Sequence, residues 1–107
     1  MKPHELRDRV PRPKLFDIRK SPDERQIPGS LRARGEALEA ADDLPFRRDE
    51  EVVLYCGSGN SCSRIAKTLQ ERGYRVTALE GGYRAWIDAG LPTEERGRPT
   101  PDGGRTL

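Results

Sequence analysis

The sequence has 107 residues, which is long enough for one folded domain and too short for two. With 33% hydrophobic and 36% charged residues, the core must be small and the surface strongly solvated. The 20 basic and 18 acidic residues nearly cancel to a net charge of +2, and no Lys/Arg block with interleaved aromatic residues occurs. We therefore expect no nucleic-acid partner.

No apolar run approaches the ~20 residues that a membrane span requires. The start of the chain, MKPHELRDRV, is charged throughout and lacks the apolar stretch of a signal peptide. We therefore expect a cytoplasmic protein that has no membrane partner and keeps its thiols reduced.

The first half of the chain predicts two short helices and one strand. Pro3 suits the first turn of a helix, and Leu6 and Val10 are spaced to share one face of it. The predicted elements are a helix over residues 2–10, a strand over 14–18, a loop over 20–30, and an extended segment from 31 that becomes helical over 36–42.

The second half alternates buried strands with helices. Ile65, Ala66 and Leu69 are spaced three and four apart, which predicts one buried helical face, and Gly73 is suited to end that helix. The predicted elements are a strand over residues 52–56, a helix over 61–72, a strand over 74–79, a Gly-Gly turn, and a helix over 83–90 with Ala85 and Trp86 inward.

Strands that alternate with helices at this spacing predict an α/β fold, with a small, mostly parallel sheet flanked by helices on both faces. We expect one domain over residues 1–92. Residues 93–107 are rich in proline and have no apolar pattern, so they predict a disordered tail.

One cysteine, Cys56, directly follows the most apolar strand. Ligands of parallel sheets bind beyond the carboxyl ends of the strands, which is where Cys56 is expected to lie. The helix that begins a few residues later would lower the pKa of a thiol at its N-terminus. Cys56 is therefore a candidate nucleophile that needs no histidine, and the alternative is a buried structural cysteine.

The segment after Cys56 is suited to form an anion-binding loop. Gly57 and Gly59 permit backbone angles that other residues resist. Ser58, Asn60 and Ser61 are short and polar and can hydrogen-bond to nearby backbone. The loop can curl so that several N–H groups converge on the sulfur, and we expect residues 57–62 to bind substrate.

Three further residues have two interpretations each. Asp17 and Arg19 end a strand at the same sheet edge as Cys56, where they would form a structural ion pair or orient a donor anion. Cys62 is either a small helix-start residue or a resolving thiol that closes a disulfide with Cys56. With one histidine, His4, far from the cysteines in sequence, no metal site is expected.

Four elements in this order resemble the single-domain rhodanese-like sulfurtransferases over roughly residues 3–92: LFDIR, QIPGS, VVLYCGSGNSC and VTALEGGYRAW. The resemblance implies a persulfide that is formed on Cys56 and passed to a thiophilic acceptor, with no cofactor. The implied partners are a small anionic sulfur donor and a thiol acceptor, which is a small molecule or a protein.

The chain departs from the family pattern at three residues. Gln26 replaces a histidine, and Ser61 and Cys62 stand where many members carry Arg and then Ser. The loop lacks the basic residues of thiosulfate-preferring members, and CGSG resembles the loop of mercaptopyruvate sulfurtransferases. Thiosulfate and mercaptopyruvate both remain candidate donors.

Two alternatives to an enzymatic sulfurtransferase are left open: a sulfur carrier or regulatory module without turnover, and a thiol-redox protein that uses Cys56 and Cys62. Phosphatases and arsenate reductases of similar architecture have an arginine six positions after the cysteine, and this arginine binds the oxyanion. That position is Cys62 here and Arg64 comes two residues later, so we do not expect phosphate chemistry.

Overall fold

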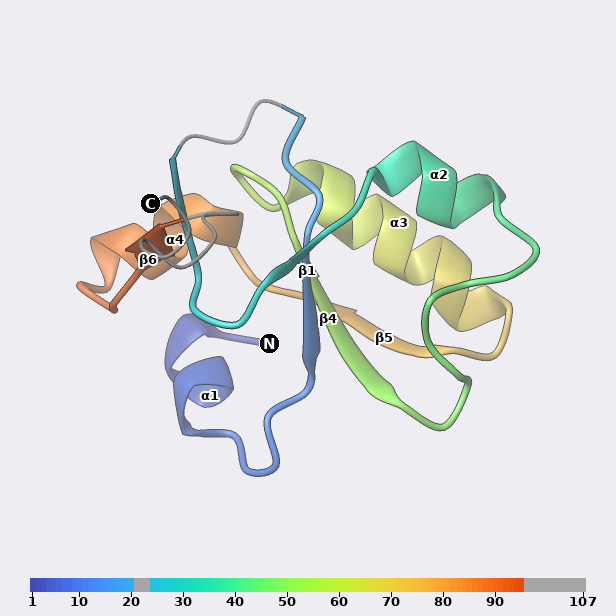
Figure 1. Cartoon of the computed structure of the whole chain (residues 1–107), viewed down its shortest axis with the longest axis horizontal. Helices are drawn as coiled ribbons and strands as arrows, with labels where there is room; N and C mark the ends of the chain where they lie inside the picture. Colours follow the sequence, from blue (N-terminus) through green and yellow to red (C-terminus); the bar gives the residue numbers. More distant parts are fainter. Residues whose placement is uncertain (21–23, 96–107) are drawn as a thin grey trace, which may run out of the picture.

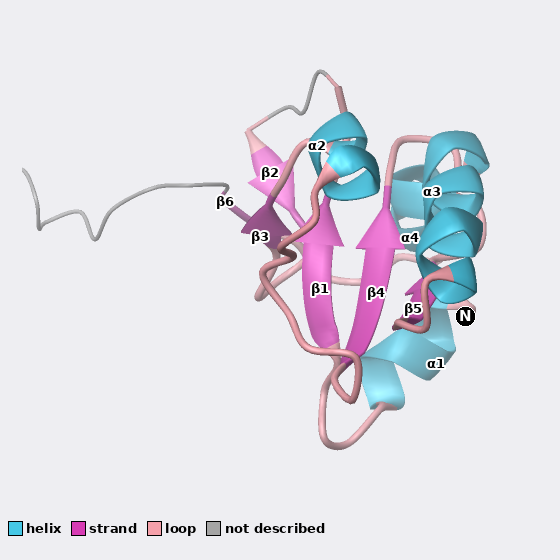
Figure 2. Cartoon of the chain, turned by 90° about the vertical axis from the view of Figure 1, so that its right-hand side faces the viewer, coloured by secondary structure: helices cyan, strands magenta, loops and turns pink. Residues whose placement is uncertain are grey.

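Four parallel strands form the central sheet of the computed structural model, which describes residues 1–20 and 24–95 (Figure 1). Their order across the sheet is β3 (Leu31–Arg32), β1 (Lys14–Asp17), β4 (Glu51–Tyr55) and β5 (Arg75–Ala78). Figure 2 shows β1 and β4 side by side and pointing the same way.

The central strand β4 is buried on both faces, as its run of apolar residues predicts. Val52, Leu54 and Cys56 belong to one hydrophobic cluster, whereas Val53 and Tyr55 belong to the other. This alternation follows from the two-residue period of a strand. The predicted two-sided burial of the sheet is therefore confirmed.

Helices cover the two faces in pairs. Helices α2 (Gly35–Ala40) and α3 (Asn60–Glu71) lie on the side of Cys56, and α1 (Pro3–Asp8) and α4 (Gly82–Asp88) lie on the opposite side (Figure 1). The predicted mostly parallel α/β fold is confirmed.

Helix α3 is the helix that begins beside Cys56, and it follows its predicted pattern closely. Ile65, Ala66 and Leu69 are almost fully buried against the sheet. Gly59 precedes the helix with a left-handed φ of 97°, and Gly73 follows it with φ 92°. Both angles favour glycine, so these two residues fix where α3 begins and ends.

Helix α1 is shorter than predicted. Leu6 is fully buried, but Val10 is 88% exposed because the helix ends at Asp8 and the backbone of Arg9 is extended. The predicted pairing of Leu6 and Val10 on one helical face is therefore wrong.

A second, two-stranded sheet lies outside the central one. Strand β2 (Arg25–Gln26) pairs antiparallel with β6 (Glu94–Glu95). The ordered chain thus extends beyond the predicted boundary at residue 92, because side chains around β2 bind this segment: Gln26 Nε2 donates to Glu94 Oε2 at 2.7 Å. The other predicted tail residues, 96–107, lie outside the described residues.

In the part of the chain that the structure describes, no helix is both long enough and apolar enough to cross a lipid bilayer.

Candidate active site

Cys56 lies where β4 ends and the loop to α3 begins, and only 6% of its surface is exposed. Its sulfur accepts a hydrogen bond from the backbone N–H of Gly59 at 3.1 Å. A second, longer bond comes from the backbone N–H of Cys62 at 3.4 Å. Both N–H groups lie at or beside the N-terminus of α3, where the helix dipole also favours a negative charge.

These contacts favour the thiolate form of Cys56. The pKa of Cys56 is lowered to about 5, chiefly because the Cys62 thiol hydrogen-bonds to its sulfur. The backbone N–H groups of Cys62, Gly59 and Ser58 lower the pKa further, whereas burial opposes them. Cys56 is therefore a thiolate at neutral pH, which is the reactive form of a cysteine.

The pKa of the neighbouring cysteine, Cys62, is shifted in the opposite direction. Its side chain is fully buried, and its sulfur lies 3.5 Å from the carbonyl oxygen of Gly59 and 3.9 Å from that of Leu79. The pKa of Cys62 is raised because its thiol donates to Cys56 and because it is buried. Cys62 therefore stays protonated next to the Cys56 thiolate.

The first turn of α4 holds the Cys56 loop from the other side of the sheet. The Tyr83 backbone N–H donates to the Cys56 carbonyl at 2.7 Å, and the Arg84 N–H donates to the Gly57 carbonyl at 3.0 Å. Gly82 makes this approach possible, because a Cβ there would lie 2.5 Å from the Cys56 carbonyl oxygen. The sequence predicts a turn at this glycine but not its contact with the loop.

Asp17 and Arg19 form a buried ion pair after β1. Arg19 Nη2 donates to Asp17 Oδ2 at 2.8 Å, and the Arg19 side chain packs over the Tyr83 ring, 4.0 Å from its centroid. Arg19 Nη2 also donates to the Arg25 carbonyl at 2.6 Å. These contacts fit the structural interpretation of the pair, although Arg19 also lines the cavity described next.

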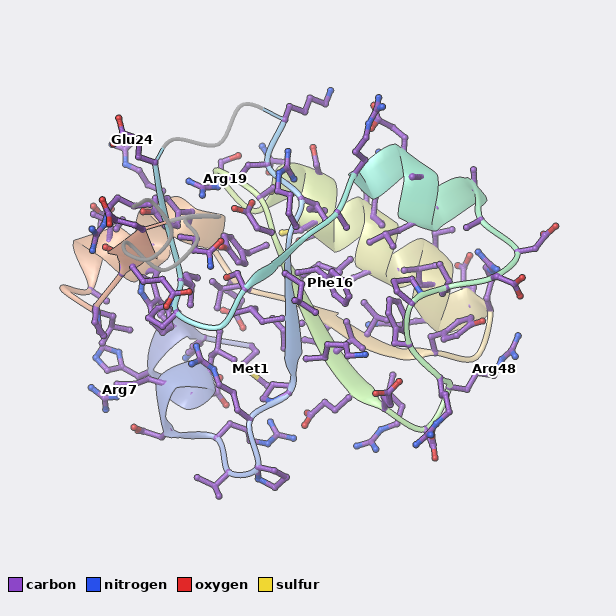
Figure 3. All side chains as sticks on the ribbon, in the orientation of Figure 1. Met1, Arg7, Phe16, Arg19, Glu24 and Arg48 are labelled. Carbon is purple, nitrogen blue, oxygen red and sulfur yellow. The ribbon has the colours of Figure 1, made fainter. Side chains whose placement is uncertain are left out.

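A cavity of about 390 Å³ opens beside Cys56 at the carboxyl ends of β1 and β4. Figure 3 shows Arg19 at this upper end of the sheet and Arg48 far from it. The cavity lining comprises Ile18, Arg19, Lys20, Gly35, Glu36, Cys56, Gly57, Ser58, Ser61, Arg64 and Ile65.

The predicted site residues divide into three groups. Gly57, Ser58 and Ser61 line the cavity with Cys56, while Gly59 and Cys62 are buried next to the sulfur. Asn60 is exposed and lies outside the lining, as does the fully buried Asp17. Of the two loop glycines, Gly59 has a left-handed φ and Gly57 does not.

Sequence reasoning missed the cavity residues contributed by other segments. Lys20 follows β1 to the same sheet edge as Arg19, so the strand direction could have indicated it. Gly35 permits the close approach of α2 to α3, since a Cβ there would lie 2.6 Å from the Ile65 Cδ1 atom. For Glu36, no feature of the sequence indicated a place in the cavity.

Arg64 also lines the cavity, but it is paired. Its Nη1 donates to both carboxylate oxygens of Glu39, at 2.9 and 2.7 Å. The expectation that this site does not catalyse phosphate chemistry therefore stays a prediction from the sequence position of Arg64. Among the described residues, no three His, Cys, Asp or Glu side chains gather as a metal site would require.

The family model of the rhodanese-like domain matches residues 2–89. This chain belongs to the rhodanese-like family. The predicted family resemblance, which rested on four short elements, is confirmed over nearly the whole described chain.

Individual relatives of this rhodanese-like domain agree with the family match. The putative sulfurtransferase YtwF of Bacillus subtilis is 33% identical over 75 residues, which cover 67% of this chain and 71% of that protein. The chain spans less than a third of the length of several other curated relatives that it matches.

Two solved structures are similar to this rhodanese-like domain. The rhodanese-related protein from Thermoplasma volcanium superposes with a TM-score of 0.76 at 22% identity, covering 88% of this chain and 95% of that one. The thiosulfate sulfurtransferase from Pseudomonas aeruginosa is 32% identical with a TM-score of 0.71, and the match covers 89% of this chain and 19% of that one.

Proposed function

We propose that the chain is a sulfurtransferase that carries sulfane sulfur as a persulfide on Cys56. The observation that supports this most directly is a buried cysteine whose sulfur accepts two backbone N–H bonds and opens on a cavity. The sulfurtransferase names of several relatives support the general activity.

In the first step, the Cys56 thiolate attacks the outer sulfur of the donor. With thiosulfate, the new Cys56 S–S bond forms as the bond between the two thiosulfate sulfurs breaks, and sulfite leaves with the electron pair of that bond. The negative charge moves to the terminal sulfur of the persulfide. The loop N–H groups that hold the thiolate would stabilise this charge, as the hydrogen-bond donors of an oxyanion hole do.

In the second step, a nucleophilic acceptor attacks the terminal sulfur. The S–S bond breaks, the transferred sulfur leaves with the acceptor, and Cys56 returns as the thiolate. Because the pKa of Cys56 is lowered to about 5, this thiolate is a good leaving group at neutral pH. The cycle requires no protein base.

The cavity does not distinguish thiosulfate from mercaptopyruvate, and we propose both as donors to be tested. Arg19 and Lys20 bring positive charge that the loop itself lacks. These cationic side chains can bind the sulfonate of thiosulfate or the carboxylate of mercaptopyruvate.

The raised pKa of Cys62 counts against a thiol-redox function. A resolving cysteine attacks as a thiolate, and Cys62 stays protonated where Cys56 is ionised. A sulfur carrier without turnover would share the same Cys56 chemistry, so only kinetics separates it from the enzyme.

The test measures sulfur transfer to cyanide from thiosulfate and from mercaptopyruvate, with circular dichroism as the check of folding. We expect the wild type to turn over and Cys56→Ser to be inactive but folded. Cys62→Ser serves as the matched control and should remain active. Activity retained by Cys56→Ser would contradict the proposal, and stoichiometric loading without turnover would indicate a carrier.

A further inference from the structure

Arg64 lies where the cavity at Cys56 meets helix α2. It lines this cavity together with Ser61, which lies three positions earlier on the same face of α3. Long side chains of a helix lean toward its N-terminus, and the N-terminus of α3 is the end beside Cys56. The geometry of α3 therefore allows the Arg64 guanidinium to reach the end of the cavity at Cys56.

The guanidinium of Arg64 is held instead by a carboxylate of α2. Its Nη1 donates to the two carboxylate oxygens of Glu39 at 2.9 and 2.7 Å. The Arg64 side chain is 60% exposed and that of Glu39 is 28% exposed. An ion pair this open to solvent is weak, because water screens it and competes for both partners. An anion in the cavity can therefore draw the guanidinium away from Glu39 at little cost.

Arg64 is also the one cation that α3 contributes to this cavity among the described residues. The other lining residues from α3 are Ser61 and Ile65, and residues 57–62 contain no basic side chain. Arg19 and Lys20 follow β1 and line the cavity from there, and Arg19 is paired with Asp17. On the α3 side, a negative charge bound at Cys56 would thus depend on Arg64.

We propose that Arg64 is a specificity-determining residue that exchanges Glu39 for the anionic group of a ligand bound at Cys56, so that Glu39 sets how strongly the cavity binds anions. This inference rests on the proposed reactivity of Cys56 and adds a residue pair to that site. A guanidinium has several N–H donors and stays charged, so the exchange replaces one acceptor by another and moves no proton.

Two alkylating agents that differ in charge measure this anion binding on the intact protein. Iodoacetate and iodoacetamide both react with the Cys56 thiolate, but only iodoacetate carries a carboxylate next to the reacting carbon. The ratio of their two rates therefore reports anion binding beside the sulfur, because any change in the thiolate population cancels from it. Intact mass follows both reactions at one low ionic strength.

We expect Arg64→Gln to lower the ratio of iodoacetate to iodoacetamide rates about fivefold. The lost hydrogen bond to the anion accounts for this fall, and the pair with Glu39 that no longer has to break reduces it. Glu39→Gln should raise the ratio about twofold, since the carboxylate no longer competes for Arg64. Circular dichroism checks that both variants fold. An unchanged ratio in either variant would overturn the inference.

The double variant shows whether Glu39 acts through Arg64. Glu39→Gln combined with Arg64→Gln should match Arg64→Gln alone. If Glu39→Gln raises the ratio as much when Arg64 is absent, its carboxylate only repels anions and the inference is overturned. Glu71→Gln removes the same charge at the far end of α3, outside the cavity, and should leave the ratio unchanged. An equal rise in Glu71→Gln would show a net-charge effect and would also overturn the inference.

Glu36 is the competing acceptor for a released Arg64. It lines the cavity, is exposed, and makes no ion pair with a described residue. If Arg64 moved to Glu36 rather than to the anion, Glu39→Gln would not raise the ratio, and the inference would fail.

Sulfur loading from thiosulfate and mercaptopyruvate, measured on the same proteins, separates this inference from the proposed function. The expected alkylation ratios without any sulfur loading would overturn the proposed function and leave the role of Arg64 standing. Sulfur loading with ratios that none of the variants changes would overturn only the role of Arg64. If neither reagent alkylated Cys56, there would be no reactive thiolate, and both would be overturned.

Discussion

Cys56 and Cys62 are buried neighbours with opposite chemistry. The Cys62 backbone N–H donates to the Cys56 sulfur, and the interaction of the two side chains lowers the pKa of Cys56 while it raises that of Cys62. The sequence predicted the position of Cys56 at the end of a buried strand, because a cysteine after an apolar strand and before a helix is a local pattern. It did not predict the effect of the Cys62 side chain on the pKa of Cys56, because that depends on how the loop curls.

The lowered pKa of Cys56 predicts the pH dependence of its reactions. The thiolate is lost as pH falls through about 5, so the rate of alkylation should halve near that pH and be constant from mildly acidic to neutral pH. Cys62→Ala removes the thiol donor and should move the midpoint to higher pH. Cys62→Ser keeps a hydroxyl donor and should move it less.

Iodoacetamide alkylation followed by mass spectrometry gives these profiles. A Cys62→Ala midpoint equal to that of the wild type would show that the backbone N–H groups alone hold the thiolate.

At the scale of elements, the loop after Cys56 is held by α4 as well as by α3. The N–H groups of Tyr83 and Arg84 bind carbonyls of the loop, and Gly82 leaves the space for them. The sequence predicted the helices and the glycine turn from local patterns. It could not predict this contact, since the partners are distant in sequence and the contact depends on how α4 packs against the sheet.

Gly82→Ala should therefore distort the loop. Its Cβ would lie 2.5 Å from the Cys56 carbonyl oxygen and 2.8 Å from the Gly59 backbone nitrogen. Gly90→Ala is the control, because Gly90 also has a positive φ, 74°, but has no atom within 4 Å of its added Cβ.

Urea unfolding and thiol alkylation rates test the comparison. We expect Gly82→Ala to lose about 1–3 kcal/mol more unfolding free energy than Gly90→Ala, from the clash alone. It should also slow alkylation of Cys56. If the two variants lose the same unfolding free energy, backbone strain alone explains both losses. The contact of α4 with the loop would then contribute nothing to stability.

At the scale of the whole molecule, the sequence predicted the fold class because strands and helices alternate with clear periods. It missed the small sheet of β2 and β6, whose two-residue strands have no detectable period. Side-chain hydrogen bonds between residues that are distant in sequence hold β6 in place. Among them, Arg25 Nε donates to the Thr93 hydroxyl at 2.9 Å, and the Gly29 N–H donates to Glu94 Oε2 at 3.0 Å.

A truncation pair tests the contribution of β6. A chain that ends at Pro92 lacks the bonds to Thr93 and Glu94, whereas a chain that ends at Glu95 keeps them. We expect the shorter chain to be less stable by about 1–2 kcal/mol in urea unfolding, since several of the lost bonds are exposed. Equal unfolding midpoints would mean that β6 contributes nothing to stability.

The central claim is that Cys56 carries the transferred sulfur. The most direct test treats the wild-type protein with one equivalent of donor, traps persulfides by alkylation, and maps the modified peptides by mass spectrometry. The account predicts one added sulfur atom on Cys56, none on Cys62, and its loss when a thiol acceptor is added. An added sulfur on Cys62, or a Cys56 persulfide that no acceptor can discharge, would contradict it.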